Sequence, residues 1–482
     1  MEHELEPHLA PVDGRTPSAR AESRPPAGRQ SLANRAHPVE PARVLDVEIT
    51  RPLPAIEPGA GSTGEPYRSA MALIRLHGQP LGTLSFRLEE GRIAPAQVAE
   101  TIWATLEAPI TEHLRADGIR CDGPLSESGI GAGQPGPAAA GCMPPCLGSA
   151  DDAAPMASVV VCTRDRPDPL LGCLESLLRI DYPRYELLVV DNAPNTAATR
   201  NLVRDRFGHL PHVRYLLEPR RGLSRARNAA LAAARGEIIA FVDDDVVVDP
   251  GWLRSIARGF RAIPGVACVT GMILPAELET WPQIWFEEFG GFNKGYERKV
   301  FDLEDHAPAD PLYPFSAGRF GSGASMAFDR QILLDLGGFD EALGAGTPTD
   351  GAEDLDAYLR VILGGHRLVY EPRSVAWHYH RRDYEALRRL MRSYGTGLAA
   401  LLTKTMMNPA TGMQVLKRAP RGVAYLLNSS SPKNAGKSTS YPRQLTMSEL
   451  FGALKGPVAY FRSRARARAK ETDAIRLETF SG

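Results

Sequence analysis

Cysteine is scarce in this chain, and its six residues do not follow the pattern of a disulfide framework. They are spread over 482 residues, whereas disulfide-stabilised domains are short and dense in cysteine. Cys142 and Cys146 form a close pair, but no second Cys or His pair follows at the spacing of a zinc site. A linker with free thiols is therefore a better interpretation than a zinc knuckle.

Long apolar runs are missing as well. No uninterrupted apolar stretch reaches the roughly 18 residues that suggest a membrane-spanning helix. The N-terminal residues lack the basic-then-apolar order of a signal peptide. We therefore expect a cytoplasmic protein, and the 43% hydrophobic and 23% charged residues indicate a globular chain with material for two or three domains.

A strong net charge is also absent, since the formal value is -1. The charge is nevertheless uneven, because residues 381–470 contain 18 Lys and Arg against 3 Asp and Glu. Basic amphipathic segments of this kind bind anionic membrane surfaces. The tail is therefore either a peripheral anchor at the inner face of the cell membrane or a solvated basic extension, and we expect no nucleic-acid partner.

Composition divides the chain into five segments. Residues 1–40 are rich in Pro, Arg, Ala and Glu and are expected to form a disordered tail. A small α+β module of unknown role is expected over residues 41–120, followed by a Gly/Pro/Ala-rich linker over residues 121–156. The main domain should occupy residues 157–380, and a helical, basic C-terminal extension should occupy residues 381–482.

The small module shows strand and helix patterns. Residues 42–50 suggest one strand, and residues 71–88 suggest two strands around a turn at residues 77–80. Apolar residues then recur every four positions from Val98 to Leu114, which predicts a helix that Pro109 should bend or break.

The main domain alternates strand and helix patterns at the spacing of βαβ units, which predicts an α/β fold with a parallel, doubly wound sheet. Its fourth strand ends in three adjacent carboxylates, Asp243–Asp245. Like charges this close need a cation among them, and hard divalent ions with oxygen ligands are the usual solution. The alternative is a solvated acidic turn, in which Asp249 and Pro250 cap the next helix.

Polar loops follow two other strands, at residues 163–166 and 191–195. Because the carboxyl ends of parallel strands meet at one edge of the sheet, these loops should line the same crevice as the Asp triplet. A helix that opens with Arg225 and Arg227 should lie nearby, and helix N-termini and guanidinium groups favour phosphate or nucleobase oxygens.

Six segments between residues 157 and 380 resemble the inverting family 2 glycosyltransferases with the GT-A fold. In the order typical of that family, they are VVVCTRDRP, LLVVDNAPN, RGLSRARNAAL, IIAFVDDDVVVDPGWL, FGSGASMAFDRQILLDLGGFDE and GAEDLDAYLRVILGG. The resemblance implies a Rossmann-like mixed sheet with helices on both faces. It also implies metal-dependent transfer of a sugar from a nucleotide-diphosphate donor to an acceptor hydroxyl, in the synthesis of bacterial cell-surface glycans or glycolipids.

The resemblance also implies residue roles on the donor side. Asp243 and Asp245 match the DxD positions that hold Mg²⁺ or Mn²⁺ against the donor diphosphate, and Asp244 is expected to face away. His378 matches an additional metal ligand, with His380 as the alternative. Nucleotide contacts are expected from Thr163, Arg164, Asp191, Arg227, Asn228 and Asp243, although Arg227 could instead be a surface arginine of its helix.

On the acceptor side, Glu353 and Asp354 match the ED pair of the family. Asp354 is the expected general base, because an inverting transfer needs one carboxylate to take the proton of the acceptor hydroxyl. Glu353 would orient the acceptor or support the loop. Alternatively, both carboxylates merely favour the positive end of a helix dipole, and Asp356 should be solvated.

Two absences narrow the function that the resemblance implies. No Gln-x-x-Arg-Trp segment follows the ED pair and no membrane-spanning run is present, so transfer of a single sugar to a glycan, lipid-linked or small-molecule acceptor is expected rather than processive synthesis. The competing hypothesis from another class is a non-catalytic scaffold with the GT-A fold, recruited through its N-terminal module and basic tail.

Overall fold

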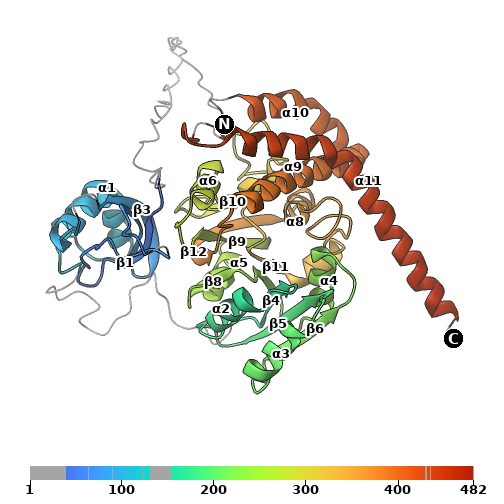
Figure 1. Cartoon of the computed structure of the whole chain (residues 1–482), viewed down its shortest axis with the longest axis horizontal. Helices are drawn as coiled ribbons and strands as arrows, with labels where there is room; N and C mark the ends of the chain where they lie inside the picture. Colours follow the sequence, from blue (N-terminus) through green and yellow to red (C-terminus); the bar gives the residue numbers. More distant parts are fainter. Residues whose placement is uncertain are drawn as a thin grey trace, which may run out of the picture.

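The computed structural model describes residues 40–130 and 154–480, apart from residues 63, 89, 90, 122, 429, 430, 432 and 435. The predicted N-terminal tail and most of the predicted linker lie outside the described residues. Figure 1 shows a small N-terminal module beside a larger α/β domain, with a group of helices from the C-terminal part of the chain at one side of that domain.

The module is a three-stranded sheet covered by one helix. Strand β2 pairs in parallel with β1 and antiparallel with β3. The elements are β1 (Arg43–Glu48), β2 (Ser69–Leu76), β3 (Gln79–Arg87) and α1 (Pro95–Ala116). The small α+β module predicted from the sequence is therefore present.

Helix α1 carries the predicted apolar stripe, since residues from Val98 to Leu114 at four-residue spacing are all buried against the sheet. Pro109 lies inside the helix, and the backbone leaves helical geometry three residues earlier, at Leu106. Proline removes a helical hydrogen bond and crowds the preceding turn, which accounts for this kink.

The module continues past the predicted boundary at residue 120. Leu53 N donates to Glu127 O at 2.8 Å, and Ile130 N donates to Ile49 O at 2.8 Å. Leu125 is buried in the same apolar core. Residues up to 130 thus belong to the module, although their composition resembles a linker.

The larger domain is built on a nine-stranded mixed sheet in the order β10-β12-β9-β11-β7-β4-β5-β6, with β8 paired to β12. Strands β6, β5, β4 and β7 are parallel, whereas β11 runs antiparallel to both β7 and β9. The strands are β4 (Ala157–Thr163), β5 (Tyr185–Asn192), β6 (Val213–Glu218), β7 (Ile238–Asp243), β8 (Val246–Val248), β9 (Val266–Pro275), β10 (Lys299–Phe301), β11 (Ser325–Asp329) and β12 (Arg367–His378).

Helices cover both faces of this sheet. Apolar residues of α2 and α5 pack in the core on one face, and those of α4 and α8 pack in the core on the other. The mixed sheet implied by the resemblance is confirmed, and the purely parallel sheet predicted from periodicity is wrong because of β11. The helices are α2 (Pro167–Leu177), α3 (Ala198–Leu202), α4 (Leu223–Ala233), α5 (Trp252–Phe260), α6 (Trp281–Phe289), α7 (Arg330–Asp335) and α8 (Glu353–Leu363), with short turns at Val203–Phe207 and Ala317–Arg319.

The module docks against the larger domain through polar and apolar contacts. Arg75 Nη1 lies 2.6 Å from Asp249 Oδ2, and Tyr67 Oη donates to Glu279 Oε1 at 2.9 Å. Asp249 Oδ1 also accepts from the indole N–H of Trp377 at 3.0 Å. Asp249 is therefore not the N-cap of α5, which begins after Gly251.

The C-terminal extension is helical, as predicted, and consists of α9 (Tyr384–Met406), α10 (Pro409–Leu427) and α11 (Arg443–Phe480). Helix α11 packs tightly along α9. A Cβ built on Gly452 would lie 2.1 Å from Arg392 O, and one built on Gly395 would lie 1.9 Å from Glu449 O. Within the described part of the chain, no helix combines the length and apolarity needed to cross a bilayer.

The close contact between α9 and α11 gives a first prediction. Gly452→Ala should destabilise the protein by about 1–3 kcal/mol, because the two backbones must separate to admit the methyl group. Gly422→Ala on α10 is the matched control, since its Cβ would meet only Leu312 Cδ2, at 3.9 Å. That control should be neutral or stabilising by up to about 1 kcal/mol. Equilibrium denaturation measures both free energies of unfolding. Equal stabilities of Gly452→Ala and Gly422→Ala would contradict the close contact between α9 and α11.

Candidate active site

The predicted polar loops come together at the carboxyl ends of adjacent strands. Thr163 at the end of β4 is in register with Asp191 of β5. Cys162, one residue earlier, is in register with Asp243 of β7. The convergence predicted from the strand pattern is confirmed, and the polar side chains that meet at this edge of the sheet are called the crevice below.

Asp191 lies at one end of the crevice and is fully buried. Its Oδ2 accepts from Tyr215 Oη at 2.9 Å, whereas none of the described residues donates a hydrogen bond to its Oδ1. Burial raises the pKa of Asp191, an effect that the Tyr215 hydrogen bond only partly offsets. A buried acceptor without a donor costs free energy, so Asp191 Oδ1 is suited to a donor group from a ligand.

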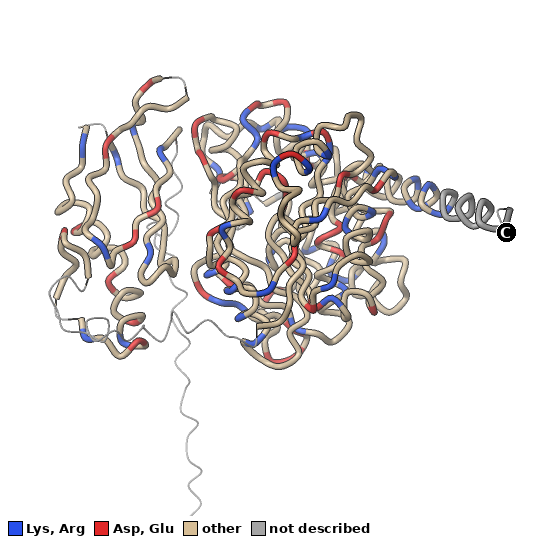
Figure 2. Tube along the Cα trace, turned by 90° about the horizontal axis from the view of Figure 1, so that it is seen from below, with Lys and Arg blue, Asp and Glu red and all other residues tan. Residues whose placement is uncertain are grey.

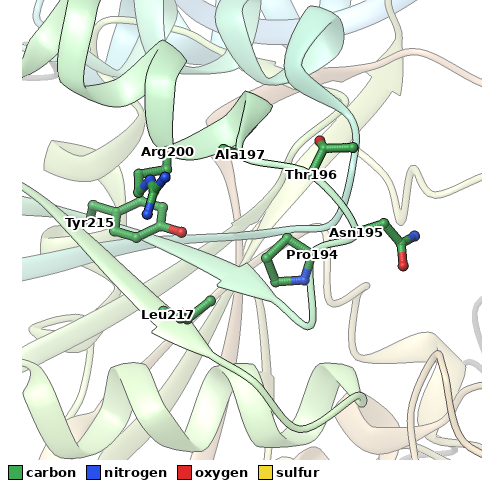
Figure 3. Close-up of a pocket in the computed structure, with 7 residues that line it drawn as sticks. All are labelled: Pro194, Asn195, Thr196, Ala197, Arg200, Tyr215 and Leu217. Carbon is green, nitrogen blue, oxygen red and sulfur yellow. The ribbon is translucent and has the colours of Figure 1, made fainter.

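A shallow cavity of about 250 Å³ lies beside Asp191 and shares Tyr215 with it. Figure 3 shows its lining, which comes from the loop after β5, from α3 and from β6. The lining residues are Pro194, Asn195, Thr196, Ala197, Arg200, Tyr215 and Leu217. Asn195 is also held by Asp165, which accepts from both its backbone and side-chain N–H groups.

The first strand contributes contacts to the acidic triplet. Thr163 Oγ1 donates to Asp244 Oδ2 at 2.7 Å, and Arg166 forms an ion pair with the same carboxylate. Asp244 is 5% exposed and points into the site, so the expectation that it faces away is wrong. Arg164 donates from Nε to Ala193 O at 3.0 Å and thereby joins the first two loops.

Asp245 is surrounded by positive or potentially positive groups. Its carboxylate lies 2.9 Å from Arg166 Nη2, 3.3 Å from Arg381 Nη1 and 3.4 Å from His378 Nε2. Burial alone would raise the pKa of Asp245, but these neighbours outweigh burial and lower it. The partnership with Arg166 and Arg381 was not predicted, because an arginine in a polar loop gives no signal of its partner.

His378 belongs to a chain of buried groups. Its Nδ1 lies 2.9 Å from His380 Nδ1, and His380 Nε2 lies 2.8 Å from Glu287 Oε1. Burial lowers the pKa of His378 to about 3, so its imidazole is neutral. When His380 donates to Glu287, His378 donates from Nδ1 to His380, and His378 Nε2 then directs its lone pair toward Asp245.

Arg227 connects the two acidic centres that the sequence separates by more than a hundred residues. Its Nη1 donates to Glu353 Oε1 at 2.7 Å, and its Nη2 lies 3.5 Å from Asp243 Oδ1. Its guanidinium also lies over the rings of Phe241 and Phe339. Arg227 is 2% exposed, so the surface-arginine alternative is wrong.

The carboxylates bound to Arg227 are difficult to ionise. Burial raises the pKa of Asp243 to about 6, and Asp245 and Asp354 add to this effect although Arg227 opposes it. Burial likewise raises the pKa of Glu353. A divalent cation in the crevice would relieve this crowding of negative charge.

Asp354 lies beside this pair at the start of α8. Its Oδ2 accepts from Gly323 N at 2.8 Å, and its Oδ1 accepts from Leu355 N at 2.8 Å. A Cβ on Gly323 would lie 3.0 Å from Asp354 Oδ2 and 3.2 Å from Arg227 Nη2, so glycine allows the close approach. Asp354 is half-buried, which leaves it accessible from the crevice.

Two other predicted polar residues have partners away from the crevice. Asn228 donates to Phe339 O and accepts from Phe339 N, both at 2.8 Å, and thus positions that loop. Its contact with a nucleotide stays a prediction. Asp356 is 2% exposed and pairs with Arg360 at 2.8 Å and Lys404 of α9 at 2.7 Å, so the prediction that it is solvated is wrong.

Known proteins match part of the chain that forms this crevice. Residues 158–327 match the glycosyl transferase family 2 profile. A glucosyl-dolichyl phosphate glucuronosyltransferase from Haloferax volcanii is 25% identical over 252 residues, which is 50% of this chain and 74% of that protein. A pre-mycofactocin glycosyltransferase from Mycobacterium tuberculosis is 31% identical over 199 residues, which is 41% of this chain but only 37% of that protein.

Among solved structures, a mannosyltransferase from Pyrobaculum calidifontis in complex with GDP-Man and Mn²⁺ is 20% identical, with a TM-score of 0.43. The match covers 75% of this chain and 99% of that one. The profile match and the relatives together identify a glycosyltransferase. Residues 158–327, which include Thr163, Asp191 and Asp243–Asp245, are thus similar to glycosyltransferase family 2.

Proposed function

We propose that this protein transfers a single sugar, with inversion, from a nucleotide-diphosphate sugar to an acceptor hydroxyl. Asp191 and Thr163 border the nucleotide end of the crevice, and Asp354 lies at the acceptor end. The proposal rests on one observation, which is that Arg227 contacts both Asp243 and Glu353. It unites the donor-side and acceptor-side carboxylates in one site, as a single-displacement reaction requires.

The proposal assigns a divalent cation to Asp243, Asp245 and His378, of which Asp245 and His378 already lie within reach of a single ion. His378 directs a neutral imidazole nitrogen toward a carboxylate 3.4 Å away, and two acceptors repel each other unless a cation lies between them. The other nitrogen of His378 is fixed by His380, as is usual for a metal-ligating histidine. Oxygen and imidazole ligands suit Mn²⁺ or Mg²⁺, and such an ion supplies Lewis-acid stabilisation of the leaving diphosphate.

The other roles in the proposed reaction are carried out by residues of the protein. Asp354 takes the proton of the acceptor hydroxyl as that oxygen attacks the anomeric carbon. The backbone N–H of Gly323 fixes the orientation of this carboxylate. Arg227 holds Glu353 beside it and positions Asp243 toward the donor. Arg166 and Arg381 keep Asp245 ionised and able to bind a cation.

A donor panel tests the proposed function. The full chain is incubated with UDP-, GDP- and dTDP-sugars in the presence of Mn²⁺ or of excess EDTA, and release of nucleoside diphosphate is measured. We expect release with at least one donor, only when the metal is present. Neither release nor metal-dependent binding with any donor would favour the non-catalytic scaffold instead.

The C-terminal helices support a further part of the proposal, which is peripheral binding to an anionic membrane that holds a lipid-linked acceptor. Helix α11 exposes a row of apolar side chains at helical spacing: Met447, Phe451, Leu454, Val458 and Phe461. Exposed Lys455, Arg462 and Arg466 flank this row, and Figure 2 shows Lys and Arg repeated along the projecting C-terminal helix. Apolar side chains beside basic ones match an anionic lipid surface.

Vesicle sedimentation tests the membrane proposal. The wild-type chain should bind anionic phosphatidylglycerol vesicles and bind neutral phosphatidylcholine vesicles weakly. Leu454→Glu combined with Val458→Glu should lower binding at least about tenfold, since Leu454 is 80% exposed and each inserted side chain contributes about 1.5–3 kcal/mol. Leu334→Glu on α7 is the control and should change nothing. Equal sedimentation of all three proteins would contradict membrane binding.

A further inference from the structure

A second constellation of polar side chains lies in the N-terminal module, far along the sequence from the crevice. His77 Nδ1, His113 Nε2 and Asp117 Oδ2 form a triangle with sides of 3.2, 3.2 and 2.9 Å. The side chains are only 11%, 11% and 3% exposed, respectively. Among the described residues, this is the one group of three or more His, Cys, Asp and Glu side chains whose ligand atoms converge closely enough to hold a metal ion.

Hydrogen bonds alone satisfy this triangle poorly. If both imidazoles donate to Asp117, two N–H groups face each other across the His77 to His113 edge of 3.2 Å. A cation bound by all three atoms removes this conflict, because each atom then directs a lone pair at the ion. Zn²⁺ binds His nitrogen and carboxylate oxygen at about 2.0–2.2 Å, which places tetrahedral ligands about 3.3 Å or slightly more apart. The atoms already lie within a few tenths of an ångström of that spacing.

The chain positions each ligand through its local structure. His113 lies in the last turn of α1 and Asp117 is its C-cap, so they are four residues apart on one side of the helix. His77 occupies the turn between β2 and β3 with φ of 53°, a backbone conformation that non-glycine residues rarely adopt.

Hydrogen bonds to Glu48 hold the strained turn at His77 in place. Glu48 accepts from His77 N at 3.1 Å and from Gly78 N at 2.7 Å. A backbone turn that a second carboxylate holds in an unusual conformation is the kind of support that surrounds a built site. Glu48 also accepts from Thr50 N and Oγ1, so its orientation is fixed in turn.

We propose that His77, His113 and Asp117 bind a divalent transition-metal ion of the Zn²⁺ class, which joins the β2–β3 turn to the C-terminal end of α1. The module has one helix on three strands, and a bound metal adds its binding free energy to the stability of such a small core. Arg75 lies near the end of β2, and its Nη1 contacts both Gly78 O in this turn and Asp249 of the larger domain. The metal thus secures the part of the module that docks on the glycosyltransferase domain.

Calorimetric titration with Zn²⁺ tests this site in the full chain carrying Asp245→Asn, which removes one of the three candidate metal ligands of the crevice. We expect one equivalent to bind and to raise the melting temperature. Asp117→Asn and His113→Ala should each lose that equivalent, and His209→Ala, at an exposed histidine of the larger domain, should retain it. Replacing Zn²⁺ by Co²⁺ should give the visible absorption of a tetrahedral site in the same proteins.

Zn²⁺ binding is measured without any sugar transfer, so the result tests the metal site separately from the proposed function. Melting temperatures in EDTA show whether a variant is folded, and Asp117→Asn preserves the size of the side chain. Absence of Zn²⁺ binding to the Asp245→Asn protein would overturn the site and leave a cluster of hydrogen bonds. Undiminished binding in Asp117→Asn and His113→Ala would also overturn it.

Discussion

Asp354→Asn should lower the rate of sugar transfer by about 10²–10⁴-fold, the usual contribution of a general base. An amide cannot take the proton of the acceptor hydroxyl, but its oxygen can still accept the hydrogen bond that Gly323 N gives to the carboxylate. The local structure should therefore persist. Binding of nucleotide with Mn²⁺ should stay close to the wild-type value, and single-turnover transfer kinetics measure the loss.

Asp335→Asn provides the matched control for this variant. Asp335 is an exposed carboxylate on α7 that accepts from Gln331 Nε2 at 2.8 Å. The control should keep full activity. Full activity of Asp354→Asn itself would remove the assignment of the base and direct attention to Glu353, the neighbouring carboxylate bound to Arg227.

Arg227→Met should destabilise the protein by about 3–5 kcal/mol, since it leaves a buried carboxylate without its cationic partner. Glu353 would lose its contact at 2.7 Å, and Asp243 would lose its nearest guanidinium at 3.5 Å. Methionine has a similar length and can fill the space between Phe241 and Phe339. The lost stability is therefore attributable to charge, and equilibrium urea denaturation measures it.

The loss should grow with pH. Burial already raises the pKa of Glu353 in the folded protein, and removal of Arg227 raises it further. The folded state then holds a proton that the unfolded state releases, so stability falls as pH rises from the unfolded value of about 4.3 through the folded value. Arg227→Met should consequently lose less stability at pH 5 than at pH 8.

Arg225→Met on the same helix is the matched control. Arg225 is also buried, but its partner Glu341 is 31% exposed and can be hydrated after the substitution. A smaller loss with little pH dependence is expected. Similar losses at both positions, or a loss at Arg227 that does not change with pH, would contradict the role of Arg227 between the two acidic centres.

The sequence pattern predicted the crevice well because strand periodicity determines which loops share an edge of the sheet. Thr163, Asp191 and Asp243 end three adjacent strands, and their convergence followed from the βαβ pattern alone. The sequence pattern did not predict that strand β11 runs antiparallel to its neighbours. Its direction depends on long-range packing, which a local pattern does not encode.

Side-chain partners were predicted less well. The ion pairs of Arg227 with Asp243 and Glu353 were not predicted, and its contact with the nucleotide stays a prediction. Asp356 was expected in water but binds Lys404. The sequence shows that such groups are charged, whereas burial and pairing arise from distant segments. The cluster at His77 was missed for the same reason, because its ligands come from a turn and a helix end 36 residues apart.

Calorimetric titration of nucleoside diphosphate, with and without Mn²⁺, tests the central claim that one crevice has a metal-binding donor half and a separate base. The wild-type chain and Asp354→Asn should bind the nucleotide with similar affinity only when Mn²⁺ is present, and Asp245→Asn should lose this metal-dependent binding. Equal loss of binding in Asp245→Asn and Asp354→Asn, or nucleotide binding that does not depend on Mn²⁺, would contradict the account.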